Sequence, residues 1–117
     1  MARLYLKWND AWEPIPLEYA GDFIEFLNDR LQSYHPLRAY KLFPVAKCRR
    51  RKRFLVEEEE ATDNLWVLDF DKRKKRVGGK NCYWYALIKT QAELDALLQS
   101  DYEDWVKYMK DAGAWVE

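Results

Sequence analysis

Two dense runs of cations are the groups in this 117-residue sequence that are best suited to bind a ligand. The first run spans residues 47–53 and the second spans residues 72–76, with Lys80 close behind. Residues 47–80 carry 12 Lys and Arg but seven Asp and Glu, so this segment is net +5 although the whole chain is neutral. Like charges at this density repel one another, and they mark either a solvated face or an anion-binding surface.

Nucleic acid is the anion that these cations favour most, because clustered Lys and Arg neutralise phosphates. Tyr83 and Tyr85 alternate on one face of a predicted strand, where exposed rings would stack on unpaired bases. The predicted nucleic-acid-binding residues are Arg49, Arg50, Arg51, Lys52, Arg53, Lys72, Arg73, Lys74, Lys75, Arg76 and Lys80.

Two other interpretations of the basic runs stay open. Lys and Arg often protect edge strands and hairpin tips from pairing with other chains, which is a role in solubility and not in binding. They also steer the docking of acidic proteins. Residues 57–60 are four consecutive glutamates, so a second copy of the chain is one such partner and a homodimer is an open alternative.

Catalytic groups are scarce. His35 is the only histidine, and it lies beside a proline at a predicted helix end. Asp69 and Asp71 share one face of a predicted strand, and with Glu57 or Glu59 on the next strand they would bind the divalent cation of a metal-dependent nuclease. The strand region lacks the Glu-x-Lys or Asp-x-Lys pattern that usually follows such a carboxylate. The sequence therefore favours a protein without catalysis, with the nuclease as an alternative.

Metal and cofactor motifs are also missing. Cys48 and Cys82 are the only cysteines, and with one histidine they supply three ligands, whereas a structural zinc site takes four. The Gly78-Gly79-Lys80 segment lacks the Gly-x4-Gly-Lys-Ser/Thr spacing of a phosphate loop. We expect no metal, no cofactor and two reduced thiols in place of a disulfide.

One helix is predicted between residues 16 and 34, where apolar residues recur at spacings of three and four. It begins either at Pro16 or, preferably, at Asp22 as N-cap, because Gly21 is unfavourable inside a helix. His35-Pro36 is expected to end it, since a residue before proline is pushed out of the helical region.

Alternating or continuously apolar segments predict five strands, at residues 3–8, 39–46, 54–56, 65–68 and 83–88. Pro44 suggests an edge position for the second, because proline donates no ladder hydrogen bond. The last two are apolar on both faces, which indicates central strands. Residues 62–64 and Gly78-Gly79 have turn chemistry.

Two helices are predicted at the C-terminal end. Residues 90–93 and 100–103 each form a capping box, and each box precedes apolar residues at helical spacing. Gly113 is a candidate helix stop, and residues 114–117 are expected to form a short strand or tail.

The resulting fold class is α+β in a single domain over residues 1–117, with element order β-α-β-β-β-β-α-α and the helices on one face of an antiparallel meander. Successive turns of a meander alternate between its ends, so both basic runs are expected to share one end, away from the acidic run. A hairpin turn at residues 61–62 would set Arg51 opposite Lys72, Arg49 opposite Lys74, and Asp71 opposite Lys52.

The sequence thus predicts a small non-enzymatic binding module whose basic sheet end engages an anionic partner, foremost nucleic acid. The alternative is a protein-interaction, inhibitor or adaptor module of the kind that mobile elements carry, docking through charge and exposed aromatic residues. The longest uncharged stretch is Asn81–Ile88, far short of the roughly 20 residues that cross a bilayer, so no membrane partner is expected. The first residues form no apolar signal-peptide block, which favours a cytoplasmic location.

Overall fold

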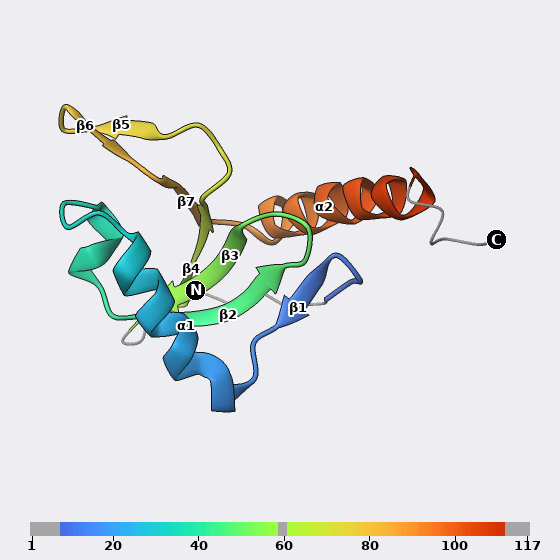
Figure 1. Cartoon of the computed structure of the whole chain (residues 1–117), viewed down its shortest axis with the longest axis horizontal. Coiled ribbons are helices and arrows are strands. Elements are labelled where there is room, and N and C mark those ends of the chain that lie inside the picture. The colour runs from blue at the N-terminus through green and yellow to red at the C-terminus, as the bar shows by residue number, and fades with distance from the viewer. Residues whose placement is uncertain (1–7, 59–60, 112–117) are drawn as a thin grey trace.

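A five-stranded antiparallel sheet with strand order β1-β2-β3-β4-β7 lies between the helices of this protein (Figure 1). The computed structural model describes residues 8–58 and 61–111. The sheet strands are β1 (Trp12–Pro14), β2 (Leu42–Cys48), β3 (Arg53–Glu58), β4 (Ala61–Asp69) and β7 (Trp84–Ile88). A separate two-stranded ribbon consists of β5 (Lys75–Val77) and β6 (Lys80–Cys82), and the helices are α1 (Leu17–Arg30), the 3-10 helix η1 (Pro36–Ala39) and α2 (Gln91–Asp111). The α+β class is confirmed, whereas the element order differs from the predicted one.

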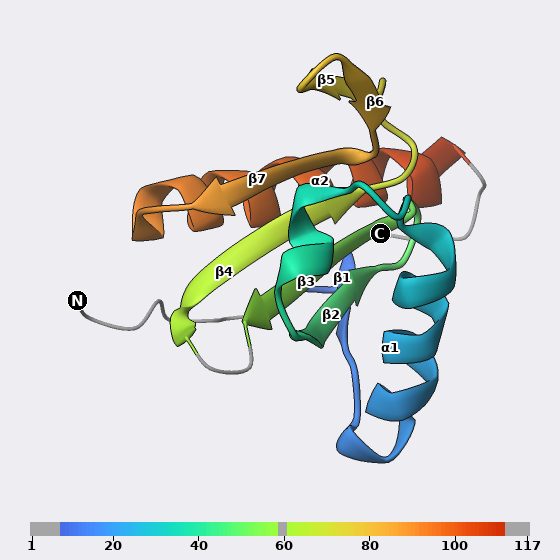
Figure 2. The same ribbon diagram turned by 90° about the vertical axis from the view of Figure 1, so that its left-hand side faces the viewer.

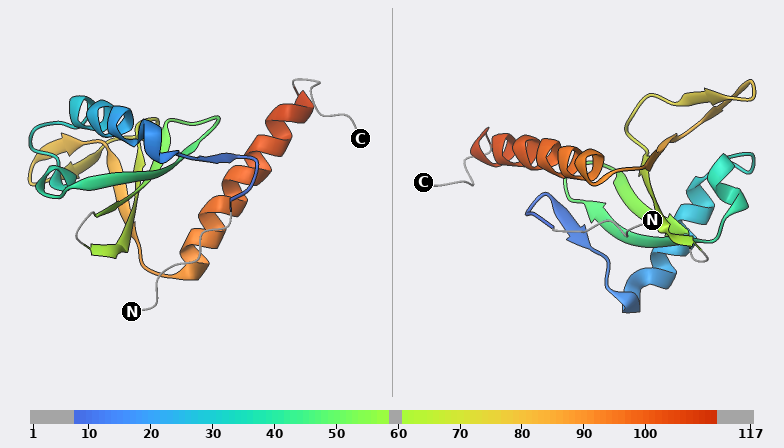
Figure 3. Two further views of the ribbon diagram at one scale, coloured as in Figure 1. Left: turned by 90° about the horizontal axis from the view of Figure 1, so that it is seen from below. Right: turned by 180° about the vertical axis from the view of Figure 1, so that it is seen from behind.

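The helices cover opposite faces of the sheet, which corrects the expectation of a single covered face. Phe54 and Val56 of β3 pack with Leu27 of α1 on one side. Leu55, between them, packs with Leu94 of α2 on the other side. Figure 3 shows α1 and α2 on either side of the strands, and in Figure 2 α2 passes behind β7. Successive side chains of a strand point to opposite faces, so a covered sheet needs apolar residues at consecutive positions.

The start of α1 is at Leu17, after Pro16 as the N-cap residue, so the preferred start at Asp22 is wrong. Gly21 lies inside the helix, at a cost of about 1 kcal/mol relative to alanine. The early start places Ala20 in the core, where it is buried. The helix ends at Arg30, before the predicted stop at His35-Pro36, and His35 instead caps η1.

The strands differ from prediction mainly at the two sheet edges. Residues 3–7 lie outside the described part, and the first described strand is β1, whose Trp12 is buried in the core. β2 is an inner strand and not the predicted edge strand, because it lies between β1 and β3. β1 pairs only with the C-terminal half of β2, however, so Pro44 in the N-terminal half has a β3 partner but no β1 partner. β4 is an inner strand as predicted, whereas β7 is an edge strand of the described sheet. Residues 62–64, predicted as a turn, belong to β4.

One continuous helix, α2, replaces the two helices predicted after the sheet. Half of the first capping box is present, with Glu93 N donating to Thr90 Oγ1 at 3.1 Å, while Glu93 Oε2 accepts from Lys89 N, one residue before the N-cap, at 3.1 Å. The second is wrong, because Ser100 and Asp101 continue the helix and Asp101 is buried against the sheet. Gly113 and residues 114–117 lie outside the described part. No helix within residues 8–58 and 61–111 is long and apolar enough to span a membrane.

The ribbon β5–β6 is an element that the strand prediction missed, although its turn was recognised. Gly78 and Gly79 have φ angles of 57° and 79°, the left-handed conformation of a two-residue type I′ hairpin turn. Figure 1 shows the ribbon projecting from the sheet beyond β7. The ribbon therefore places a cationic segment away from the core layers.

Candidate nucleic-acid interface

Both basic runs lie at the same end of the sheet, as the meander predicts. The loop before β3 contacts the end of β4 through a 2.8 Å hydrogen bond from Phe70 N to Lys52 O. Asp71 Oδ2 also accepts a 2.8 Å hydrogen bond from Lys52 N. The predicted register is wrong by one residue, because Arg53 is the partner of Asp69 and the ladder ends there. The last pair of the β3–β4 ladder is therefore the oppositely charged Arg53–Asp69, and the predicted like-charge pairs Arg51–Lys72 and Arg49–Lys74 do not form.

The arginines of the first basic run are largely neutralised by carboxylates. Arg50 Nη1 and Arg51 Nη2 both lie 3.3 Å from Asp104 Oδ2 on α2. Arg49 Nη1 lies 3.5 Å from Glu13 Oε2 on β1. These pairs are partly exposed, so each contributes little to stability, but they lower the positive potential that the run presents to a ligand.

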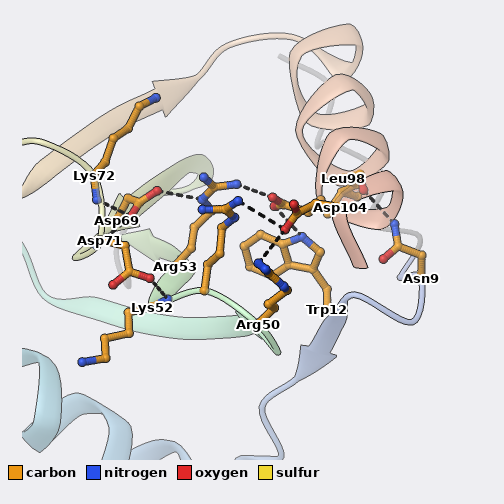
Figure 4. Close-up of polar contacts among 12 residues, drawn as sticks. Asn9, Trp12, Arg50, Lys52, Arg53, Asp69, Asp71, Lys72, Leu98 and Asp104 are labelled. Atoms are coloured by element: carbon orange, nitrogen blue, oxygen red, sulfur yellow. Dashed lines mark hydrogen bonds and ion pairs between the residues drawn. The ribbon is translucent and has the colours of Figure 1, made fainter. Parts of the chain in front are cut away.

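Arg53 is a structural residue of the core, not a surface cation (Figure 4). Its Nε donates to Asp69 Oδ2 at 2.8 Å, and its Nη1 donates to Asp101 Oδ1. Burial alone lowers the pKa of the Arg53 guanidinium, but hydrogen bonds and charges from the two carboxylates outweigh it and raise this pKa. Both carboxylates are almost fully buried, so the guanidinium supplies the positive charge that their burial requires.

Asp69 and Asp71 do not form the cation site expected of a nuclease. Asp69 Oδ1 accepts hydrogen bonds from Asp71 N at 2.9 Å and from Lys72 N at 3.0 Å, while Oδ2 faces Arg53. Glu57 pairs with Leu65, toward the opposite end of β4, and Glu59 lies outside the described residues. Within the described ranges no three His, Cys, Asp or Glu side chains are grouped as metal ligands.

The second basic run and the ribbon form a continuous cationic segment, which we call the basic ribbon and define as residues 72–82. It contains six cations and no acid. No described carboxylate forms an ion pair with any of them. The cations are Lys72, Arg73, Lys74, Lys75, Arg76 and Lys80, and all but the half-buried Lys75 are exposed.

Aromatic rings take the place of carboxylates beside the lysines of the basic ribbon. The Lys72 ammonium lies 3.9 Å from the centroid of the Trp84 ring. The Lys75 ammonium lies 5.2 Å from that centroid and 4.5 Å from the centroid of Tyr85, and it also donates to Tyr85 O. Such contacts attract a cation without cancelling its charge, so they orient the lysines and leave the segment positive.

Two further lysines make the same kind of contact. Lys74 Nζ lies 4.9 Å from the centroid of Tyr83, and Lys80 Nζ lies 5.0 Å from that of Tyr34. Tyr83 also packs edge-on against Phe70 at 4.8 Å between centroids. Tyr83 and Tyr85 are half-buried against the α1-side core cluster and carry lysines over their rings, so they are not the open stacking platform that alternation in the sequence suggested.

The root of the basic ribbon is fixed by the segment that follows α1. Tyr34 Oη donates to Asn81 O at 2.6 Å. His35 is buried, and its Nε2 lies 2.9 Å from Tyr83 O. A carbonyl only accepts, so Nε2 carries the proton and Nδ1 accepts from Leu37 N at 3.1 Å. Burial lowers the pKa of His35, against the Tyr83 hydrogen bond that raises it, and the nearby Lys75 charge lowers it further.

Sequence patterns did not identify the carboxylates that pair with cations of the first basic run and, among the described residues, leave the second run unpaired. Asp101 and Asp104, which neutralise arginines of the first run, lie in what was expected to be the start of a separate helix. The absence of acids from residues 72–82, in contrast, is visible in the sequence and was the available signal for the second run.

Comparisons of this chain with protein-family models, with curated proteins and with solved structures found no match in any of the three.

Proposed function

We propose that this protein is a binding module that engages nucleic acid through its basic ribbon. The observation that carries the proposal is the difference between the two basic runs. In the first run the four arginines (Arg49, Arg50, Arg51 and Arg53) have carboxylate partners and the two lysines (Lys47 and Lys52) do not, whereas all six cations of the basic ribbon have none among the described residues. An anionic ligand would relieve the mutual repulsion of these six charges.

A phosphate backbone suits a row of cations better than a single small anion does. Each phosphate that a lysine or arginine neutralises releases condensed counterions, and the logarithm of affinity falls by about 0.9 per contact with the logarithm of salt concentration. Six contacts would give a slope of about −5 on duplex DNA. The lysine–aromatic contacts support the proposal, because they restrain four long side chains that would otherwise lose rotamer entropy on binding.

Fluorescence anisotropy with labelled DNA and RNA at about 50 and about 200 mM salt tests this function. The key variant carries Lys72, Lys74 and Lys75→Ala, and the matched control carries Arg49, Arg50 and Arg51→Ala, which removes the same number of charges. We expect the first variant to bind nucleic acid more weakly, with an affinity that depends less on salt concentration. The control should retain most of the wild-type affinity and most of its salt dependence. Circular dichroism establishes that each variant is folded.

Absence of binding even at low salt would overturn the proposal and would favour the protein-interaction alternative. An acidic protein, or the acidic run of a second copy of the chain, would then be the partner for the same cations. Equal losses in both variants would also count against the proposal, because they would indicate a response to net charge alone.

A reducing compartment such as the cytoplasm is part of this proposal. Cys48 and Cys82 are both free thiols, and each is buried in the protein. Disulfides are rare where thiols are kept reduced, and two buried free thiols fit such a compartment.

A further inference from the structure

We infer that the ribbon β5–β6 enters the major groove of duplex DNA and that Arg76 and Asn81 contact base edges there. This inference rests on the proposed function and names its ligand. It follows from the shape of the ribbon, from which side chains lie on its outer face, and from the hydrogen-bonding chemistry of those side chains.

The ribbon has the form that a major groove accepts. β5 and β6 are antiparallel strands of three residues each, joined by the tight Gly78-Gly79 turn. Paired strands lie about 4.8 Å apart, and the major groove of B-DNA, about 12 Å wide, admits a two-stranded ribbon with its side chains. Figure 1 and the right-hand view in Figure 3 show the ribbon extending away from the core layers, so its tip is not covered by another element.

The two faces of the ribbon differ sharply. Lys75 and Cys82 are paired across the strands and face the body of the protein, where Cys82 is buried and Lys75 donates to Tyr85 O. Side chains of neighbouring positions alternate between faces. The next pair, Arg76 and Asn81, therefore lies on the opposite, outer face, and both residues are exposed.

Arginine and asparagine are the side chains best suited to read DNA bases. An arginine guanidinium donates two hydrogen bonds to O6 and N7 of guanine, and an asparagine amide pairs in the same bidentate way with N6 and N7 of adenine. In the described residues neither side chain has a hydrogen-bond partner, and only the backbone carbonyl of Asn81 is engaged, by Tyr34. Directly opposed side chains lie about 5 Å apart at Cβ, close enough to reach neighbouring base pairs.

The flanking cations supply the non-specific part of the interface. Arg73 and Lys74 precede β5, and Lys80 begins β6, so positive charge lies on both sides of the Arg76–Asn81 pair. Phosphate contacts of this kind fix the position of a protein on the duplex, whereas base contacts carry sequence information. The ribbon thus has both types of contact within one short segment.

The same observations favour duplex DNA over other nucleic acids. Single strands are held mainly by stacking on open aromatic rings. Beside the ribbon, Tyr83 and Tyr85 are half-buried with lysines over their rings, and the one exposed ring among the described neighbours, Tyr34, has Lys80 over it. Double-stranded RNA has a deep, narrow major groove that protein side chains do not enter. B-form DNA is the nucleic acid whose groove matches the ribbon.

The test begins with a pool of DNA duplexes of about two helical turns with a randomised centre, from which the wild-type protein selects a preferred sequence. Anisotropy then compares the selected duplex, a scrambled duplex, the selected single strand and the matching RNA duplex. We expect the DNA duplex to bind at least about tenfold more tightly than the single strand or the RNA duplex. We also expect the selected duplex to exceed the scrambled one by about tenfold.

Substitutions separate base reading from charge. Arg76→Lys keeps the charge but loses the planar fork, so it should remove the preference for guanine at one position and leave affinity for the scrambled duplex within about twofold. Asn81→Ala should remove a preference for adenine in the same way. Arg73→Lys, the matched control, should leave the selected sequence and its advantage unchanged.

The possible outcomes distinguish failure of the major-groove inference from failure of the proposed nucleic-acid binding. Binding of single strands or RNA duplexes as tight as that of DNA duplexes would overturn the inference and leave the proposed function standing. Selection that yields no preferred sequence, or a preference that survives both Arg76→Lys and Asn81→Ala, would also overturn it. Absence of binding to every probe would remove the proposed function itself.

Discussion

The indole Nε1 of Trp12 donates a 3.0 Å hydrogen bond to Oδ2 of Asp101, although the two residues are 89 positions apart in the chain. The other oxygen of Asp101 accepts from Arg53, so one carboxylate joins β1, β3 and α2. All three side chains lie at the core, where unpaired polar groups are costly. Asp101 therefore fixes the middle of α2 against the sheet.

Asp101→Ala is expected to lower the free energy of unfolding by about 3 kcal/mol, because it leaves the Arg53 charge with one carboxylate and the Trp12 indole without an acceptor. Urea denaturation followed by tryptophan fluorescence measures the change. Asp95→Ala, an exposed position on the same helix, is the control and should alter stability by no more than about 0.5 kcal/mol. Similar effects of the two substitutions would contradict this role of Asp101.

Stability should depend on pH through His35. The pKa of His35 is lowered in the folded protein, so between that pKa and the reference value of 6.5 the unfolded chain binds more protons than the folded one. The free energy of unfolding therefore rises with pH in this interval, and stability is lost as the pH falls below about 6.5. Urea midpoints between about pH 7 and about pH 5 measure this effect. His35→Asn should weaken the dependence, and an unchanged slope in that variant would assign it to other groups.

Glycine is required at the tip of the basic ribbon but not in α1. Gly79→Ala forces an L-residue to a φ of 79°, at a cost of about 1 kcal/mol, and should speed amide exchange in β5 and β6 by roughly fivefold while the core stays protected. Gly21→Ala meets no atom within 4 Å of its new Cβ, and should stabilise the protein by about 0.5–1 kcal/mol. Hydrogen exchange that is equally fast throughout the Gly79→Ala variant would contradict the local effect.

Asp104 is expected to restrain the affinity of the protein for anions. It pairs with both Arg50 and Arg51, so Asp104→Asn releases two arginines at the end of the sheet that carries the basic ribbon. If the proposed function holds, this variant should bind DNA more tightly. The slope of log affinity against log salt concentration should become steeper by the amount that about one or two additional phosphate contacts produce. The control Glu103→Gln removes a charge from a neighbouring exposed position of α2 and should have a smaller effect. Equal gains from both substitutions would contradict a specific role for Asp104.

Local patterns in the sequence predicted the inner strands well and the edges poorly. Phe54–Val56 and Leu65–Leu68 lie in inner strands, as predicted. They were predictable because a short apolar run between polar flanks is a strong signal for a strand that is buried on both faces. Ser100–Glu103 has the pattern of a helix start, but burial of Asp101 against Arg53 and Trp12 keeps α2 continuous. Gly21 was expected to exclude the first turn of α1, but packing of Ala20 outweighs a cost of about 1 kcal/mol.

The candidate site was likewise predictable only in part. That the two basic runs share a sheet end followed from the alternation of turns in a meander, which depends only on strand order. Which cations have carboxylate partners depended on contacts between residues far apart in sequence, such as Arg51 with Asp104. A shift of one residue in register sets Asp69 opposite Arg53, and the ladder ends at this pair, before the predicted Arg51–Lys72 pair.

The place of the basic ribbon in the chain makes it a replaceable segment. β4 ends at Asp69 and β7 begins at Trp84, and these two residues are themselves paired in the sheet. The residues between them leave and return at one rung of the ladder, so their two ends are only about 5 Å apart, as in a hairpin. A loop of different length or sequence would close the same gap without altering the register of the five strands. Natural variation or engineering can therefore exchange the basic ribbon while the α1–sheet–α2 scaffold remains intact.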